Sequence, residues 1–135
     1  MNDEASGAKP LLERVAIVTG SRQGIGRGVA MCLARAGAHV IIADQVSERI
    51  ASVTSAIEDL GVQALGVATD VSRSDDVQRM IRQTVERFGK IDILVNNAGT
   101  LVVKPMVEQT EEEWDRVLDV NLKGCFSAVA TCCPR

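Results

Sequence analysis

A glycine-rich stretch near the start of the chain is the first set of residues whose types and spacing suggest chemistry. Its sequence is Thr19-Gly-Ser-Arg-Gln-Gly-Ile-Gly26. Gly20 allows a tight turn, whereas Gly24 and Gly26 leave no Cβ between an approaching phosphate and the backbone. A helix that begins here would add free N–H groups and the positive end of its dipole. The stretch is therefore predicted to hold a phosphate group; the alternative is an ordinary turn between a strand and a helix.

A carboxylate follows at Asp44, at the end of a second apolar run. It can accept hydrogen bonds from the hydroxyl groups of a ribose. It would repel a ribose 2′-phosphate by about 4 kcal/mol at a separation of about 4 Å and an effective dielectric of about 20. This favours NAD over NADP, although Arg22 is counter-evidence because its guanidinium could pair with that phosphate. Alternatively, Asp44 simply opens the next turn.

Two later motifs also come directly after apolar runs. Asp70-Val71 is by itself only a turn signal. Asn96-Asn-Ala-Gly99 is more specific, since its adjacent amides could tie strand ends together. Its Ala-Gly pair would leave room for a ligand against the backbone.

The elements that must position these residues alternate regularly. Short apolar runs rich in β-branched residues predict four strands, at residues 14–20, 39–43, 62–69 and 91–95. Apolar residues at helical spacing come after each run, and Gly37, Gly61 and Gly89 end the first three helices. The first helix is expected to bury Ile25, Val29, Cys32, Leu33 and Ala36.

Capping signals mark where two of the later helices begin. Ser72 with Asp75 resembles a capping pair, and Thr110 with Glu113 a capping box. The last helix is predicted from about Thr110 towards the end of the chain, with an apolar stripe of Trp114, Val117, Leu118, Asn121, Leu122 and Cys125.

Strict alternation of strands and helices predicts parallel strands joined by right-handed crossovers. Phe88, Trp114 and Phe126 are the only aromatic residues besides His39, so the core must be aliphatic, as suits a sheet buried on both faces. We therefore predict an α/β fold, a Rossmann-like doubly wound parallel sheet truncated after the fourth strand and its helix. Residues 1–12 are expected to form a flexible tail, and residues 13–135 an NAD(P)-binding Rossmann domain that is incomplete at its C-terminus.

Composition disfavours several other classes of protein. The chain has 135 residues and a net charge of -3 without a long block of like charge, so a nucleic-acid partner is not expected. Its four cysteines and single histidine lack the spacing of metal ligands, so no metal is expected. Residues 1–10 lack the apolar region of a secretory signal, and no stretch approaches 18 apolar residues. A cytoplasmic location without membrane association is therefore predicted.

Together the motifs resemble those of the short-chain dehydrogenase/reductase family, in its N-terminal half. The matching pieces are Thr19-Gly-x-x-x-Gly-Ile-Gly26, Asp44, Asp70-Val71, Asn96-Asn-Ala-Gly99 and Val120-Asn-Leu-Lys-Gly124. The family includes 3-oxoacyl-carrier-protein reductases and glucose dehydrogenase-like enzymes. The resemblance implies an NAD(P)-dependent oxidoreductase that moves a hydride between nicotinamide and an alcohol/ketone substrate. It also implies a homo-oligomer for the complete form.

The resemblance also implies a role for each matching residue. Those expected to bind the dinucleotide are Gly20, Arg22, Gly24, Ile25 and Gly26 at the pyrophosphate, Asp44 at the adenosine ribose, Asp70 and Val71 at the adenine, and Asn97, Ala98 and Gly99 beside the nucleotide. Asn121 matches the catalytic asparagine, which in the family holds a proton-relay water at a helix irregularity.

The chain departs from the family in its catalytic groups. The family uses a tyrosine as acid and base, with a lysine that lowers its pKa and a serine that polarises the substrate. This sequence contains no tyrosine, and Lys123 is not a substitute because there is no phenol for it to act on. The chain is therefore expected to supply the cofactor-binding half and to be inactive alone.

Two other functions remain open from the sequence. The chain could be a non-catalytic module that binds a dinucleotide or pairs with another subunit through its last helix. It could instead be a methyltransferase that uses S-adenosylmethionine, but Asn96-Asn-Ala-Gly99 and Val120-Asn-Leu-Lys-Gly124 would then be unexplained.

Overall fold

The computed structural model of the chain describes residues 9–133 and contains a single parallel sheet with helices on both sides. In chain order the elements are β1 (Val15–Thr19), α1 (Gly24–Arg35), β2 (His39–Asp44), α2 (Ile50–Glu58), β3 (Ala64–Ala68), α3 (Ser74–Phe88), β4 (Ile93–Val95), the 3₁₀-helix η1 (Met106–Glu108), α4 (Glu111–Leu118), the π-helix η2 (Asp119–Lys123) and α5 (Gly124–Cys132). The strand order is β3-β2-β1-β4, and all pairs are parallel. The predicted α/β, Rossmann-like sheet is confirmed.

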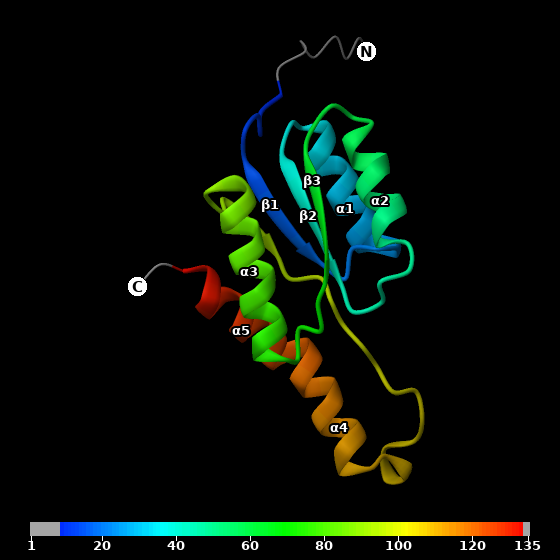
Figure 1. Cartoon of the computed structure of the whole chain (residues 1–135). Coiled ribbons are helices and arrows are strands. Elements are labelled where there is room, and N and C mark those ends of the chain that lie inside the picture. The colour runs from blue at the N-terminus through cyan, green and yellow to red at the C-terminus, as the bar shows by residue number, and fades with distance from the viewer. Residues whose placement is uncertain (1–8, 134–135) are drawn as a thin grey trace.

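The two faces of the sheet carry separate apolar clusters, because side chains alternate along each strand. Ala16 and Val18 of β1 lie in one cluster with the buried residues of α1 and α2. Val15 and Ile17 lie in the other, which includes buried residues of α3 and Ala128 of α5. Helices α1 and α2 therefore cover one face and α3 and α5 the other, as in a doubly wound fold (Figure 1).

The strand order places a topological switch between β1 and β4. The chain moves from β1 outward to β2 and β3, and then crosses to the opposite side of β1 to form β4. Loops at the carboxyl ends of β1 and β4 therefore lead to helices on opposite faces, which opens a crevice between them. The glycine-rich turn comes after β1, and Asn96-Asn-Ala-Gly99 comes after β4.

Helix α1 buries small residues instead of the large ones expected from the sequence. Gly26, Ala30 and Ala34 are its buried residues, whereas Ile25 is 81% exposed and Cys32 is also exposed. The predicted stripe is wrong at those two positions. The physical reason is close packing: a helix that lies directly on the strands has room only for small side chains on its inner face.

The apolar stripes of α2 and α3 agree better with the predicted spacing. Helix α2 buries Ile50, Val53 and Ile57, and α3 buries Val77, Met80, Ile81 and Thr84. Gly89 ends α3 in the left-handed region, at φ +77°. The capping box before α4 is confirmed, because Thr110 and Glu113 each accept a hydrogen bond from the backbone N–H of the other.

The capping pair predicted for α3 is wrong. The helix begins at Ser74 with Arg73 as its N-cap residue, one residue later than the pair implied, and the Ser72 hydroxyl donates to Asp70 Oδ1 at 2.6 Å. Asp76, not Asp75, accepts a hydrogen bond from a backbone N–H before the helix, that of Asp70 at 3.0 Å. This bond, together with Arg79, lowers the pKa of Asp76.

The segment predicted as one last helix consists of α4, η2 and α5. Much of its apolar stripe faces outward, with Trp114 50%, Leu118 39% and Leu122 66% exposed. Helix α4 and the chain before it project from the body as an arm (Figure 1). Periodicity identifies this apolar face but not what covers it, and within residues 9–133 much of it is left uncovered.

Most of the predicted N-terminal tail, residues 1–8, lies outside the described residues. Leu11 is half-buried against the cluster on the α1 and α2 face, and its N–H donates to the Ala36 carbonyl at 2.9 Å. Contact with the body therefore begins by Leu11.

Asp92 forms hydrogen bonds and ion pairs at the start of β1, and these contacts make the stability of the fold depend on pH. Its carboxylate accepts from the Val15 N–H at 2.9 Å and pairs with Lys90 at 3.1 Å and Arg14 at 3.0 Å. These partners lower the pKa of Asp92 to about 2 from 3.8. Because the folded-state pKa is the lower one, the stabilisation is complete above about pH 4 and is lost as the pH falls through about 2.

We therefore expect Asp92→Asn to lower the melting temperature at neutral pH, and the deficit to shrink towards zero as the pH approaches 2. Thermal unfolding across this pH range measures it. Glu86→Gln, at an exposed position of α3, is the matched control and should show no such trend. A deficit that stays constant with pH would show that the Asp92 charge is not its cause.

Candidate functional site

A cleft of about 310 Å³ opens where the strands of the sheet end. Every residue that the sequence predicted to contact a dinucleotide lines it, namely Gly20, Arg22, Gly24, Ile25, Gly26, Asp44, Asp70, Val71, Asn97, Ala98 and Gly99. Six further residues line the cleft without having been predicted from the sequence, Gln23, Gln45, Thr69, Thr100, Arg116 and Val120. Several of these adjoin a predicted motif, whereas Arg116 has no such signal.

The glycine-rich turn has the backbone conformation that its glycines permit. Gly20 and Gly24 have φ of +65° and +58°, in the left-handed region that residues with a Cβ rarely adopt. The Gly20 N–H donates to the Ala43 carbonyl at 2.7 Å, which fixes the turn to the end of β2. Gln23 precedes α1, and its side chain does not cap the N–H groups of the first helical turn. The turn therefore presents open backbone donors to the cleft.

Gly26 is required for a different reason from the one that the sequence suggested. A Cβ at this position would overlap the carbonyl oxygen of Gly20 and the side-chain amide of Asn97. At Gly24, by contrast, an added Cβ would meet nothing within 4 Å. Gly26 thus allows close packing inside the protein, between α1 and the loops after β1 and β4.

Thr19, which is buried, and Asn97, which lines the cleft, join the ends of β1 and β4. Thr19 Oγ1 accepts from the backbone N–H groups of Asn97 and Ala98, at 3.1 and 3.0 Å. Asn97 Nδ2 donates to the carbonyl oxygens of Thr19 and Gly20, both at 3.0 Å. These four hydrogen bonds hold the two loops at a fixed separation beside the switch point.

Asp44 and Arg22 form an ion pair in the wall of the cleft. Arg22 Nε donates to Asp44 Oδ1 at 3.1 Å, and the Arg22 N–H donates to Oδ2 at 3.3 Å. The side chains are 10% exposed for Asp44 and 22% for Arg22. Asp44 also accepts from the Val46 N–H at 3.1 Å. The carboxylate is therefore held rigidly at the rim, and the arginine charge is largely neutralised by it.

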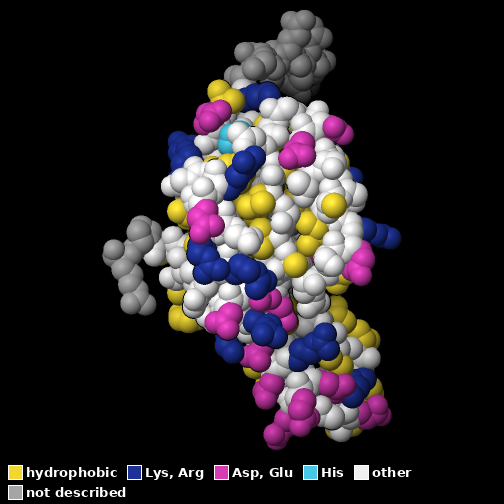
Figure 2. Space-filling view, in the orientation of Figure 1, with side chains coloured by type: hydrophobic (Ala, Val, Ile, Leu, Met, Phe, Trp, Pro, Cys, Tyr) yellow, Lys and Arg dark blue, Asp and Glu magenta, His cyan; other side chains and the backbone are white. Residues whose placement is uncertain are grey.

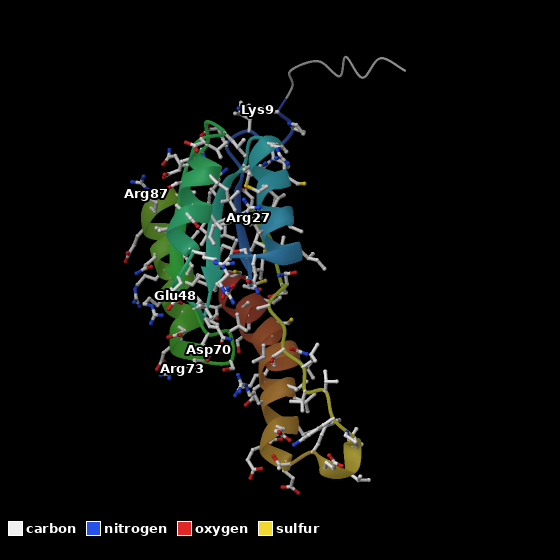
Figure 3. The ribbon with its side chains drawn as sticks, turned by 90° about the vertical axis from the view of Figure 1, so that its right-hand side faces the viewer. Lys9, Arg27, Glu48, Asp70, Arg73 and Arg87 are labelled. Carbon is white, nitrogen blue, oxygen red and sulfur yellow. The ribbon has the colours of Figure 1, made fainter. Side chains whose placement is uncertain are left out.

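Asp70 and Val71 form the wall beyond β3. Asp70 Oδ1 accepts from the N–H and the hydroxyl of Ser72, whereas its second oxygen accepts no hydrogen bond from residues 9–133. Val71 is buried and packs so closely on Gly124 that a Cβ there would lie 2.8 Å from Val71 Cγ2. Figure 3 shows Asp70 at the end of the body from which α4 extends.

Asn121 lies in the π-helical turn η2 and does not line the cleft. Its Oδ1 accepts from the Thr100 N–H at 2.8 Å, and its Nδ2 donates to the Thr100 carbonyl at 2.9 Å. Its own carbonyl accepts from Cys125 Sγ at 3.3 Å. The side chain is thus committed to the loop after β4, and the helix irregularity expected around this residue is present as the π-helix.

We expect Asn121→Ala to raise the hydrogen-exchange rate of the Thr100 amide by about tenfold, because it removes both side-chain bonds to that residue. Asn121→Asp should raise it less, since a carboxylate keeps the acceptor but faces the Thr100 carbonyl without a donor. Cys125→Ala is the control, because it leaves both bonds to Thr100 intact. Equal exchange in Asn121→Ala and the unchanged chain would contradict this tether.

Charge is unevenly distributed over the molecule. Acidic side chains gather on the projecting arm (Figure 2), from Glu108, Glu111, Glu112, Glu113 and Asp115.

No group of three or more His, Cys, Asp or Glu within residues 9–133 is placed to hold a metal ion. No helix in the same range is both long and apolar enough to cross a bilayer.

Comparison with known sequences and structures gives a consistent result. The family model described as short chain dehydrogenase matches residues 14–135. The 3-oxoacyl-[acyl-carrier-protein] reductase FabG of Staphylococcus epidermidis is 36% identical over 125 residues, which are 92% of this chain and 51% of that protein. The chain thus spans about half the length of the curated relatives it matches.

Two solved structures share the fold. A short-chain type dehydrogenase/reductase of Mycobacterium marinum has a TM-score of 0.87 and 35% identity, over 92% of this chain and 50% of that one. An NAD+-bound xylitol dehydrogenase has a TM-score of 0.86 and 29% identity, over 90% and 47%.

Proposed function

Because this chain belongs to the short-chain dehydrogenase family, we propose that its cleft binds a nicotinamide dinucleotide, and NAD in preference to NADP. The observation that carries the proposal is the placement of Asp44. Its carboxylate stands at the carboxyl end of β2 and lines the cleft with the glycine-rich turn. A carboxylate there can accept hydrogen bonds from the ribose hydroxyl groups, and its charge repels a 2′-phosphate.

Arg22, the counter-argument from the sequence, supports NADP less once its contacts are considered. Its Nε bonds to Asp44, and its Nη1 donates to Gln23 Oε1 at 2.9 Å. A 2′-phosphate would have to take the guanidinium from a carboxylate that itself repels the phosphate. The pair therefore favours the dinucleotide without the extra phosphate.

The residues present fit such a cofactor. The cradle formed by Gly20 and Gly26 excludes any larger residue, and the first turn of α1 offers uncapped N–H groups for a pyrophosphate. In this proposal Gly24 and Ile25 also line the pyrophosphate, Asp44 holds the adenosine ribose, and the wall at Asp70 and Val71 meets the adenine. Asn97, Ala98 and Gly99 form the floor beside the nucleotide.

The reaction proposed for the whole protein is oxidoreduction of an alcohol/ketone substrate, for which the bound nicotinamide supplies or accepts a hydride. Asn121 would position the helix and loop next to the reacting groups through its bonds to Thr100. The sequence of this chain contains no tyrosine. We therefore propose that this chain supplies cofactor binding, and that an acid–base group from outside it completes the chemistry.

Calorimetric titration of the chain with NAD and NADP tests the proposal. We expect NAD to bind about tenfold or more tightly than NADP, because the Asp44 charge discriminates against the phosphate. No hydride transfer to added ketones is expected from the chain alone. Binding of neither dinucleotide would overturn the proposed function, and equal binding would overturn its preference for NAD.

A second candidate function, pairing with another subunit, is favoured by one observation. Trp114, Leu122 and Phe126 lie along α4, η2 and α5 with 50%, 66% and 71% of their surfaces exposed. Exposed apolar surface of this extent marks interaction sites. Light scattering at increasing protein concentration would reveal self-association, whereas a constant monomer mass would count against pairing of identical chains.

A further inference from the structure

Arg116 is a cationic residue of the cleft that neither the motifs nor the proposed cofactor contacts account for. It is exposed on α4 and lines the same cleft as the glycine-rich turn. The only other cation among residues 9–133 that lines this cleft is Arg22, which is paired with Asp44. Within the same range, Arg116 makes no ion pair and no side-chain hydrogen bond. Its charge and its donors are therefore available to a ligand.

The carboxylates three residues before and three residues after Arg116 are engaged by other side chains. Glu113 pairs with Lys104 and completes the capping box with Thr110. Asp119 pairs with Lys123 across one turn of η2. Helix α4 thus holds three acidic residues in its first turn and still leaves its one arginine without an ion pair among the described residues.

The packing of α5 places Arg116 at the adenine end of the proposed cofactor site. Val71, in the wall beyond β3, packs directly on Gly124 at the start of α5. Val120 is about one helical turn before Gly124, and Arg116 about one turn before Val120, and both line the cleft. The row that they form therefore extends outward from Val71. Figure 3 shows the neighbouring Asp70 where this helical segment leaves the body.

We propose that Arg116 is a cofactor-binding residue whose guanidinium packs on the adenine ring. This inference rests on the proposed function, since it requires a dinucleotide in the cleft. A guanidinium is planar and weakly hydrated, so it stacks on an aromatic face better than an ammonium does. Val71 and Val120 offer apolar surface for the same ring, whereas Asp70 lies at its edge. Arg116 would close the exposed side of this pocket when the nucleotide binds.

The test is calorimetric binding of NAD, NADP, ADP-ribose and nicotinamide mononucleotide to Arg116→Ala, Arg116→Lys and the unchanged chain. We expect Arg116→Ala to weaken NAD and ADP-ribose by the same factor, about three- to tenfold, and to leave nicotinamide mononucleotide unaffected. Arg116→Lys should bind NAD with an affinity between those of Arg116→Ala and the unchanged chain, because it retains the positive charge but not the planar guanidinium. Arg82→Ala, which removes the same charge from an exposed position of α3 that does not line the cleft, should bind normally.

The remaining outcomes separate this inference from the proposal on which it rests. If the unchanged chain binds no dinucleotide, the proposed function fails and the inference fails with it. If the unchanged chain binds NAD and Arg116→Ala binds it equally well, only the inference is overturned. A loss confined to NADP would also overturn it, by assigning Arg116 to the 2′-phosphate. Equal melting temperatures of the variants would show that weakened binding does not come from unfolding.

Discussion

Asp44→Ser is expected to reverse the cofactor preference of the cleft. The substitution removes the acceptor for the ribose hydroxyls, which should weaken NAD by about tenfold. It also removes the charge that repels a 2′-phosphate and releases Arg22 Nε, which that charge now holds at 3.1 Å. NADP should then bind about tenfold more tightly or better, because an arginine freed from its carboxylate can pair with the phosphate. Calorimetric titration with both dinucleotides measures the change.

The double variant Asp44→Ser/Arg22→Ala identifies the source of the gain. If the freed guanidinium binds the phosphate, the double variant should lose most of the new affinity for NADP while remaining weak for NAD. If repulsion by Asp44 is the whole effect, the double variant should bind NADP as well as the single one. A single variant that still prefers NAD would show that Asp44 does not determine the cofactor.

Gly26→Ala and Gly28→Ala are expected to change stability in opposite directions, although they lie two residues apart on α1. A Cβ at Gly26 would overlap the Gly20 carbonyl and the Asn97 amide, which are hydrogen-bonded to each other. We expect a loss of about 3 kcal/mol or more, since neither neighbour can move without breaking hydrogen bonds. A Cβ at Gly28 would meet nothing within 4 Å, so alanine should stabilise the helix by about 1 kcal/mol.

Urea unfolding of the two variants and the unchanged chain measures both effects. Gly28→Ala is the matched control, because it makes the same chemical change in the same helix. Gly26→Ala should also abolish dinucleotide binding under conditions in which it remains folded, because relief of the clash must displace the loop after β1 or the loop after β4. Similar stability of the two variants would refute the close packing at Gly26.

The sheet and the members of the cleft could be predicted from sequence because they depend on local patterns. Short β-branched runs that end in glycine, asparagine or aspartate identify both the strands and the loops that leave their carboxyl ends. In a parallel sheet those loops meet at one edge. Residues from four separate loops, from Gly20 to Gly99, therefore line a single cleft.

The sequence was a poor guide to burial, capping and cleft position at residues whose role depends on neighbours that are distant in the sequence. Ile25 fits the helical period of α1, but the surface beneath that helix admits only Gly26, Ala30 and Ala34. Asp75 has the spacing of a cap, yet the helix begins at Ser74 and Asp76 accepts the hydrogen bond from the Asp70 N–H. Arg116 had no motif to mark it, because its place in the cleft depends on how α5 packs against Val71.

The small buried face of α1 joins the hydrophobic core to the ligand site as one rigid body. Ala30 and Ala34 pack with strand residues of the sheet and Gly26 against the loops after β1 and β4, and the open N–H groups stand at the end of the same helix. A methyl group added beneath the helix would lift its axis, and the helix would transmit that displacement along its length to the cleft. The volume of the side chains beneath α1 is therefore linked to the affinity of the cleft for its ligand, because a shift of the helix axis moves the N–H groups at its end. Larger residues at Ala30 and Ala34 should therefore weaken ligand binding before they lower the stability of the fold.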